Sequence, residues 1–536
     1  MDGSPHFVTP KRGGEDIGYS GLDKGSSPRR VRRSLLVSAS YSAAEIDNSI
    51  GKEAYSYYFV ARAFAPLLGR LGATSGITRP ESRLDYAVWR AERQGLEAIH
   101  LSFLPVHLAY LSSRVPNVAF PSWEFPDIPS VDLAGNPRNN WARIANHFSL
   151  IVCHSRTARE AFLKAGVTAP VRLVPVPLQS HYFSLPQWEP GQSMTLDCPC
   201  FELPEPRPTT ETLADAAEEL GGLGARGTSR HAYRRFVKPY LAGFLDRSIW
   251  RAACAAGLVP KRRPEEDIPC KLRPSVRLSG IVYTTIFNPF DPRKNWQDLL
   301  TSFLLAFREQ ADVTLVVKLA IRPAMLRQGL LEVFEFYRNS GLSHRCKVVL
   351  IWSYLSEPQM LGLTRASTFY VNASRAEGSC LPLQNFLASG RPGIAPVHSG
   401  LADYFDEHVG FAVESHPEPA AFPHDPEKRL LTSWHRLVWS SLHEQLIASY
   451  RFVRDGYQHY RAMGERARQS MEEYSREEAV WPKLSEALES VSKQLANGGV
   501  HPAATSIRPG PTNITAGKNS EAQSVFLDGV QMSAWY

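Results

Sequence analysis

The sequence contains few cysteines and no long apolar run. Its seven cysteines are scattered over 536 residues, which excludes a disulfide framework. Cys198-Pro199-Cys200 has no second pair at zinc spacing, so we interpret it as linker, with a metal site as the alternative. No stretch reaches the roughly 18–20 consecutive apolar residues of a membrane helix, and the first residues lack the apolar core of a secretory signal. We therefore expect a cytoplasmic protein.

A Walker A motif is also missing. The spacing Gly-x-Gly-x-x-Gly occurs once, at 222–227, where it follows a helix-like segment and not a strand, so it is no dinucleotide-binding fingerprint. Both observations argue against ATPases, kinases and dehydrogenases. Hydrophobic residues make up 43% and charged residues 21%, values typical of globular proteins, which excludes a wholly disordered, collagen-like or coiled-coil chain. The length predicts two or three domains.

The net charge of +7 is unevenly distributed. Residues 226–273 hold twelve Lys or Arg against four Asp or Glu, whereas residues 186–224 hold eight acids and one Arg. Adjacent segments of opposite sign argue against a nucleic-acid-binding surface, so we expect no nucleic-acid partner.

Two stretches alternate strand-like with helix-like segments. This alternation predicts an α/β fold with two parallel sheets, each covered by helices on both faces. We expect a tail at 1–33, an N-terminal domain at 34–178, a linking insertion at 179–276, a C-terminal domain with closing helices at 277–496, and a second tail at 497–536; both tails have disorder-prone compositions. The expected strands are 34–40, 98–103, 117–120, 150–153 and 171–176 in the first domain, and 280–287, 313–319, 347–352, 368–373, 393–397 and 410–414 in the second.

The insertion contains a basic amphipathic segment. Tyr233, Phe236, Val237, Tyr240 and Phe244 recur at helical spacing, with arginines largely outside that stripe. This pattern indicates either a helix packed on a neighbouring domain or contact with an anionic membrane surface.

The clearest chemical signal lies between an expected strand and an expected helix, at residues 374–382. Here a loop brings Glu377 and the backbone N–H groups of Gly378, Ser379, Cys380 and Leu381 to the end of a sheet. N–H groups at a helix N-terminus form an anion site, and a carboxylate beside it suits a ligand with both phosphate and hydroxyl groups. An ordinary strand–helix turn is the alternative.

A second signal follows the strand at 280–287. Arg293 and Lys294 stand at the start of the next helix, where cations oppose the helix dipole. A bound anion would account for them: Lys294 as a point charge on a diphosphate, and Arg293 as a fork onto phosphate or carboxylate oxygens. Solvated surface charges are the alternative.

Together these pieces resemble the retaining family 4 glycosyltransferases, the "glycosyltransferases group 1" domain of the GT-B fold. The resemblance covers residues 277–492 and, more loosely, 34–177. It implies that Lys294 binds the donor diphosphate. Asn288 stands near the position of a helping arginine, whose part Arg293 could take. It also implies that Glu377 meets the sugar hydroxyls, while Asn385 stands where the family has a ribose-binding glutamate.

The same resemblance implies that the N-terminal domain faces the acceptor. Trp123 and Glu124 follow the strand at 117–120. Trp123 could stack on a sugar face and Glu124 could accept a proton or hold a hydroxyl, so we predict an acceptor-side role for both. A surface loop is the alternative.

The sequence thus predicts a GT-B fold with two Rossmann-like domains facing a cleft. The predicted catalytic residues are Glu377, Lys294 and Glu124. We expect a nucleotide-diphosphate sugar donor, a glycan or lipid-linked acceptor of surface polysaccharide synthesis, retention of configuration, and no metal or other cofactor. The location would be the cytoplasm or the inner membrane face. The alternatives are a non-catalytic nucleotide-sugar-binding or scaffold protein on this fold, and a related enzyme such as an epimerase.

Overall fold

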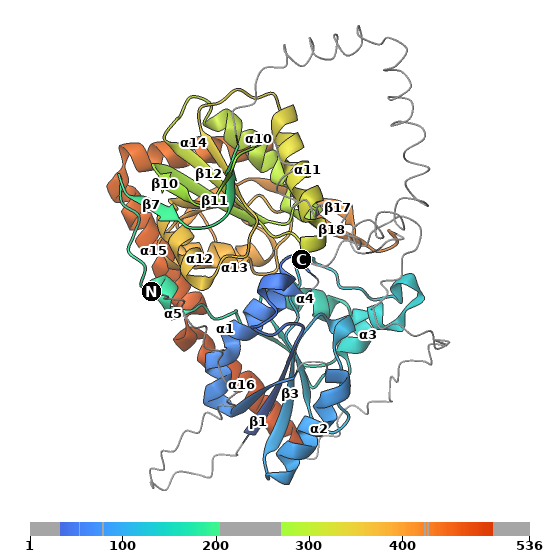
Figure 1. Cartoon of the computed structure of the whole chain (residues 1–536). Coiled ribbons are helices and arrows are strands. Elements are labelled where there is room, and N and C mark those ends of the chain that lie inside the picture. The colour runs from blue at the N-terminus through green and yellow to red at the C-terminus, as the bar shows by residue number, and fades with distance from the viewer. Residues whose placement is uncertain are drawn as a thin grey trace, which may run out of the picture.

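The computed structural model describes residues 33–52, 54–77, 80–203, 270–422, 425 and 428–496. Figure 1 shows its two α/β domains one above the other. The predicted tails and the amphipathic segment at 233–244 lie outside these residues.

The N-terminal domain is built on a six-stranded parallel sheet. Its order is β2-β1-β3-β4-β5-β6, so the direction of winding reverses between β1 and β3. The strands are β1 (Arg33–Ala39), β2 (Ala73–Ile77), β3 (Glu97–Phe103), β4 (Asn117–Ala119), β5 (Leu150–Cys153) and β6 (Val171–Leu173). The helices are α1 (Tyr55–Leu71), α2 (Pro80–Arg93), α3 (Trp141–Ala145) and α4 (Arg156–Lys164), with short 3₁₀ turns at Asp47–Ser49, Val106–Leu108, Leu133–Gly135 and Pro137–Asn139.

The C-terminal sheet repeats this design with more strands. Six parallel strands run in the order β16-β15-β14-β11-β12-β13, which reverses between β11 and β14. They are β11 (Ile281–Phe287), β12 (Val313–Leu319), β13 (Lys347–Ile351), β14 (Phe369–Val371), β15 (Gly393–Pro396) and β16 (Gly410–Val413). Ligands of such sheets bind at the carboxyl ends of the strands, where the winding reverses.

Helices cover both faces of this sheet. They are α10 (Trp296–Ala306), α11 (Leu326–Asn339), α12 (Glu357–Ala366), α13 (Leu381–Ala388), α14 (Trp439–Asp455) and α15 (Tyr457–Ser475), with 3₁₀ turns at Pro292–Lys294, Pro323–Met325 and Ser399–Asp403. The start of α12 carries a capping box, in which Gln359 Oε1 accepts the Ser356 N–H at 2.9 Å.

The last helix joins the domains. α16 (Glu477–Ala496) leaves α15 and packs against the N-terminal domain, beside α1 and β1 in Figure 1. Its buried Val480, Leu484 and Leu488 share an apolar cluster with Leu35 and Phe64. This crossing, together with two Rossmann-like sheets, confirms the predicted GT-B fold class with C-terminal helices.

Part of the predicted linker belongs to the C-terminal domain instead. After a short helix α5 (Ser180–Phe183), β7 (Ser193–Leu196) pairs with β10 (Val276–Ser279). β8 (Cys200–Glu202) pairs antiparallel with β13 and carries β9 (Leu272–Arg273) at the sheet edge. These strands were not predicted because the segment is rich in proline, which is atypical of strands.

A second difference is an antiparallel hairpin, β17 (Ser415–Ala421) with β18 (Leu431–Leu437). The last strand expected from the sequence was 410–414, so neither strand of the hairpin was predicted. The hairpin matters because it reaches the N-terminal domain, as described below.

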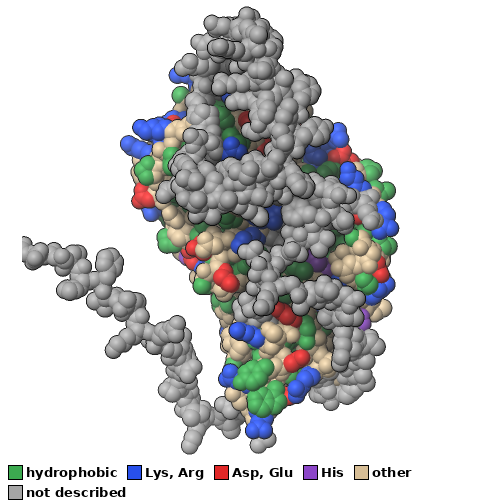
Figure 2. Space-filling model, turned by 45° about the vertical axis from the view of Figure 1, so that its right-hand side comes forward, with side chains coloured by type: hydrophobic (Ala, Val, Ile, Leu, Met, Phe, Trp, Pro, Cys, Tyr) green, Lys and Arg blue, Asp and Glu red, His purple; other side chains and the backbone are tan. Residues whose placement is uncertain are grey.

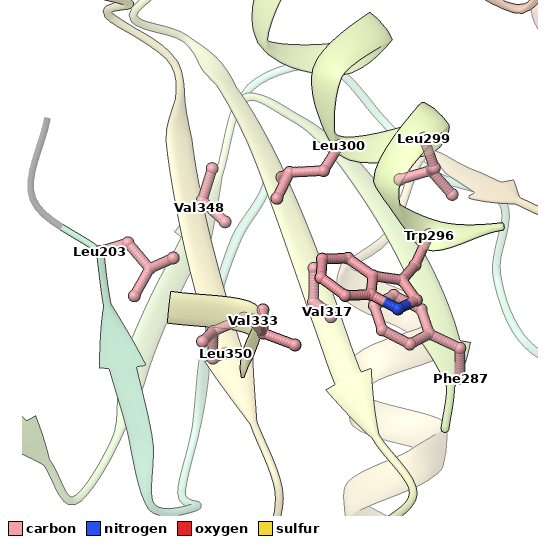
Figure 3. A pocket seen from close by; sticks show the side chains of 9 residues that line it. All are labelled: Leu203, Phe287, Trp296, Leu299, Leu300, Val317, Val333, Val348 and Leu350. Carbon is pink, nitrogen blue, oxygen red and sulfur yellow. The ribbon is translucent and has the colours of Figure 1, made fainter. Parts of the chain in front are cut away.

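Two other features lie outside the site. An apolar void of about 10 Å³ lies in the C-terminal core. Figure 3 shows the side chains that line it: Phe287, Trp296, Leu203 and six other aliphatic residues. Its lining offers no polar partner for water. On α2, Tyr86 and Trp89 are 62% and 44% exposed, and Figure 2 shows hydrophobic and basic side chains together at that lower end of the molecule.

Candidate active site

Two loops meet at the point where the C-terminal sheet reverses. The first follows β11 and holds the 3₁₀ turn Pro292–Lys294, which Asp291 caps by accepting the Arg293 N–H at 3.0 Å. The second follows β14 and leads through Glu377 to α13. Because β11 and β14 are neighbouring parallel strands, their loops emerge side by side.

Lys294 and Glu377 are in direct contact. The Lys294 Nζ lies 2.6 Å from Glu377 Oε1, and the side chains are 19% and 7% exposed. Ser374 Oγ donates to the same oxygen at 2.6 Å and Asn372 Nδ2 at 3.1 Å. Within the described residues no hydrogen bond reaches Glu377 Oε2, so this oxygen is available to a ligand hydroxyl.

Both groups of this pair remain charged. Burial by itself would raise the pKa of Glu377, but Lys294, Arg293 and the Ser374 hydrogen bond outweigh it and lower that pKa. Burial would likewise lower the pKa of Lys294, but Glu377 outweighs it and the pKa is raised. The site therefore offers a fixed anion and a fixed cation at neutral pH.

The main chain of Glu377 is held by the turn after β15. Ser399 Oγ accepts the Glu377 N–H at 3.0 Å, and Gly400 N–H donates to the Glu377 carbonyl at 2.8 Å. A Cβ on Gly400 would lie 2.0 Å from the Gly378 oxygen, so only glycine fits. This glycine therefore lets the turn after β15 pack directly against the backbone of the Glu377 loop.

The N-terminus of α13 adds backbone donors beside Glu377. Cys380 adopts a left-handed conformation, with φ of 51°, just before the helix. In the described part of the chain, the N–H groups of Gly378, Ser379, Cys380 and Leu381 have no acceptor. The Cys380 thiol accepts from Asn372 Nδ2 at 3.1 Å, and burial raises its pKa to about 12, so it stays neutral. These N–H groups lie where the sequence predicts an anion site, and their binding of an anion stays a prediction.

Of the two partners expected for Arg293, phosphate or carboxylate oxygens, the structure has carboxylates of the chain itself. The buried guanidinium of Arg293, 2% exposed, contacts Glu124 Oε1 at 2.9 Å and Asp291 Oδ2 at 2.7 Å. Two carboxylates already engage its fork, so this geometry does not fit the expected grip on a diphosphate. Asn288 is also engaged locally, because its Oδ1 accepts the Phe290 N–H at 3.1 Å.

The acceptor-side residues are buried as well. The Glu124 side chain is 1% exposed and bound to Arg293, which does not fit a general base open to substrate. Trp123 is also 1% exposed, packs on Trp141 and Phe422, and donates its Nε1–H to the Asp127 carbonyl. Such packing leaves no ring face for a sugar.

A cavity of about 100 Å³ lies between the domains next to α13. Its lining comes from three parts of the chain: α1, the segment 177–182, and the C-terminal domain with Leu381 and Asn385. Arg62 of α1 and Glu357 of α12 form an ion pair at its wall, and His181 Nδ1 lies 3.2 Å from Glu357. Asn385 therefore faces a space bounded by both domains.

Sequence reasoning missed several residues of the site. Asn372, Ser374 and Ser399 fix Glu377, while Arg62 and Glu357 belong to the cavity. Asn372 directly follows β14 and Ser374 lies two residues further on, a position that could have signalled them. Arg62 gives no such signal, because it lies in the middle of an amphipathic helix.

None of the helices in the described ranges combines the length and apolar character needed to span a bilayer. The described residues also contain no cluster of three His, Cys, Asp or Glu side chains placed to hold a metal ion.

No protein-family model and no curated protein matches the sequence. Among solved structures, the chain is similar to HepE from Anabaena in complex with UDP and glucose: 13% identity over 85% of this chain and 99% of that one, with a TM-score of 0.45. It is also similar to α,α-trehalose 6-phosphate synthase from Burkholderia multivorans, with 10% identity over 87% and 100% of the chains and a TM-score of 0.47. A sucrose-phosphate synthase from Thermosynechococcus elongatus shares 11% identity over 86% and 100%, with a TM-score of 0.44.

Proposed function

We propose that this protein is a glycosyltransferase that uses a nucleoside-diphosphate sugar. The observation that carries the proposal is the Lys294–Glu377 pair, 2.6 Å apart at the switch point of the C-terminal sheet and beside the N-terminus of α13. A cation, a helix N-terminus and a carboxylate at one place match a ligand that joins phosphates to a hydroxyl-rich ring.

The reaction would follow from these charges. The bond between the anomeric carbon and the phosphate oxygen breaks, and its electron pair leaves with the diphosphate. Lys294 and the N–H groups from Gly378 to Leu381 stabilise the departing negative charge, while Glu377 Oε2 accepts a hydrogen bond from the sugar. The acceptor hydroxyl bonds to the anomeric carbon and gives its proton to the departing phosphate oxygen.

Two features of this scheme remain expectations from the family resemblance. Attack on the face that the leaving group departs from would retain the anomeric configuration. Lys294 and the helix N-terminus would supply positive charge to the diphosphate without a metal ion.

The nucleoside would occupy the interdomain cavity. Asn385 lies one helical turn from Leu381, so a ribose beside Asn385 would place its diphosphate at the start of α13. An amide can bind two ribose hydroxyls, though without the strength that a carboxylate adds. Tyr354 and Leu355 would contact the base.

For the acceptor we propose a glycan or a lipid-linked glycan of surface polysaccharide synthesis, used by a cytoplasmic enzyme that can attach to the inner membrane face. The support is the family resemblance and the basic amphipathic sequence at 233–244. Sedimentation of the full chain with liposomes tests the membrane part: binding should need anionic lipid, and equal binding to neutral vesicles would contradict it.

The decisive experiment is a panel of nucleoside-diphosphate sugars, scored by thermal shift and by release of nucleoside diphosphate. Lys294→Ala should abolish release with the active donor, whereas Lys347→Ala, an exposed lysine at the amino end of β13, should not. Unchanged release in Lys294→Ala would remove Lys294 from the mechanism.

Asn385 favours a second candidate, a non-catalytic nucleotide-sugar-binding protein, because it replaces a carboxylate that the family uses. A thermal shift with one donor, but no release and no transfer with any acceptor, would support this alternative.

A further inference from the structure

Arg293 ties together the two loops that carry Lys294 and Glu377. Its carbonyl accepts the Arg375 N–H at 2.7 Å, and its Nη1 donates to the Ala376 carbonyl at 3.4 Å. Both partners lie within two residues of Glu377, and Arg293 itself precedes Lys294. Any displacement of Arg293 would therefore move the two charged groups relative to each other.

The N-terminal domain reaches both loops through one dipeptide. Glu124 binds the Arg293 guanidinium at 2.9 Å, and the Trp123 carbonyl lies 3.0 Å from the place where a Gly378 Cβ would stand. Trp123 and Glu124 thus contact the immediate sequence neighbours of Glu377 and Lys294. These two contacts cross from one domain to the other.

An apolar layer covers this junction. Phe422, which follows β17, is buried with its ring centroid 5.5 Å from those of both Trp123 and Phe125. The hairpin is fixed on both sides: His435 N–H donates to the Arg375 carbonyl at 2.8 Å, and Thr432 Oγ1 donates to Asp127 Oδ2 at 3.2 Å. The cover excludes water, which strengthens the ion pair beneath it.

We propose that Glu124 and Arg293 are positioning residues that couple closure of the two domains to assembly of the active site. Arg293 holds the Lys294 and Glu377 loops in register, and Glu124 engages Arg293 only when the domains are together. The effect on catalysis rests on the proposed function. The coupling of domain closure to the placement of Lys294 and Glu377 does not.

Glu124→Gln tests the catalytic consequence in the full-length protein. The amide keeps the size but loses the charge, so we expect turnover to fall on the order of 100-fold through misplacement of the reacting groups. Affinity for the nucleoside diphosphate should stay within about 3-fold, because the cavity is untouched. Unchanged turnover would overturn the proposal.

The pH profile separates positioning from a general loss of structure. Lys294 is surrounded by Glu377, Arg293, Asp291 and Cys380; its pKa is raised, and the Arg293 charge opposes that rise. Without the Glu124 charge, Arg293 should lower the pKa of Lys294 more strongly. The alkaline limb of the pH profile of turnover should therefore move to lower pH. Glu124→Asp, which keeps the charge, should leave that limb in place; a shift of equal size in both variants would contradict the proposal.

Thr432→Val is the matched control. It removes a hydrogen bond across the same interface without contacting either catalytic loop, so turnover should stay within about 2-fold. An equal loss of turnover in Thr432→Val and Glu124→Gln would overturn a specific role for Glu124.

Amide hydrogen exchange gives a readout that needs no substrate. In Glu124→Gln, segments 292–295 and 374–378 should exchange faster than in the wild type, since the Arg375 N–H is bonded to Arg293. Unchanged exchange there would overturn the coupling. If no donor binds the wild type, the proposed function fails, and the exchange result alone decides the coupling.

Discussion

The two domains share a sheet topology but bury different chemistry at their central strands. In the N-terminal sheet, Ser38 Oγ lies 2.9 Å from His100 Nε2, and His100 Nδ1 lies 2.9 Å from Asn117 Oδ1. All three are buried, and burial lowers the pKa of His100 to about 4. The C-terminal switch point instead holds the charged pair of Lys294 and Glu377.

This difference favours the C-terminal domain as the location of the proposed ligand site. Burying polar groups costs little when each one is hydrogen-bonded, as in the neutral network around His100. Burying a cation and a carboxylate costs more and rarely improves stability over apolar packing. A charged pair at a ligand-binding position is therefore better explained by binding and catalysis than by folding.

Among the substitutions that test this comparison, Glu377→Gln should have the largest effect. The amide removes the anion that faces Lys294 and the proposed sugar, so we expect turnover to fall by about 100-fold or more. Donor titrations with diphosphate release measure this, and Glu407→Gln, an exposed acid of the same domain, is the control. If Glu377→Gln turned over within a few-fold of the wild type, the carboxylate would be structural, like the network around His100.

A second buried cation, Lys318, tests how much a buried charge costs in stability when it has no carboxylate partner comparable to Glu377 among the residues that the structure describes. Lys318 on β12 is buried, its Nζ donates to the Leu319 carbonyl at 2.8 Å, and burial lowers its pKa to about 7, with Cys198 opposing. Between pH 7 and the ordinary lysine pKa near 10.4, Lys318 binds more protons in the unfolded chain than in the folded one. Its buried charge therefore destabilises the fold fully below pH 7, and this destabilisation fades as pH rises.

Lys318→Met should therefore stabilise the protein more at pH 6 than at pH 9, with a difference of about 3 kcal/mol in the free energy of unfolding. Urea unfolding at the two pH values measures it. Lys347→Met, at an exposed site on β13, should show no such difference. A pH-independent gain in Lys318→Met would mean that Lys318 is not desolvated as the structure indicates.

The neutral network of the N-terminal domain should show its own pH dependence. Because the pKa of folded His100 is about 4, the unfolded chain binds more protons between pH 4 and 6.5, and stability is lost as pH falls through that window. At pH 5 this amounts to about 2 kcal/mol. His100→Gln should reduce the loss and leave turnover at pH 7 unchanged; His154, with a similar pKa, accounts for part of the remaining loss.

Much of the fold could be predicted from local patterns. Buried parallel strands such as β11 and β12 appear as continuous apolar runs, and Ser356 and Gln359 announce the start of α12. β17 could not be found this way, because Pro417 and Pro419 are atypical of strands, and its pairing with β18 depends on residues further along the chain.

The site likewise has contacts that local sequence patterns predict and contacts that they do not. Lys294 and Glu377 each sit in a loop whose strand and helix are visible in the sequence, so their meeting could be expected. The partnership of Arg293 with Glu124 could not, because it depends on how two separately folded domains pack. For the same reason, a tryptophan expected to face a sugar proved to be core: Phe422, from the unforeseen hairpin, covers Trp123.

The smallest expected effect concerns Asn385, the neutral residue at the cavity between the domains. Asn385→Glu would add a charged acceptor for ribose hydroxyls, and charge-assisted hydrogen bonds are roughly twice as strong as neutral ones, so nucleoside-diphosphate affinity should rise a few-fold. Calorimetry with ribo- and 2′,3′-dideoxynucleoside diphosphates measures it, and the gain should be confined to the ribonucleotide. Asn339→Asp, at the exposed end of α11, controls for added charge. An equal gain for both nucleotides would mean that the ribose does not lie beside α13. The donor would then not be placed to reach the buried charges of Lys294 and Glu377 at the switch point of the C-terminal sheet.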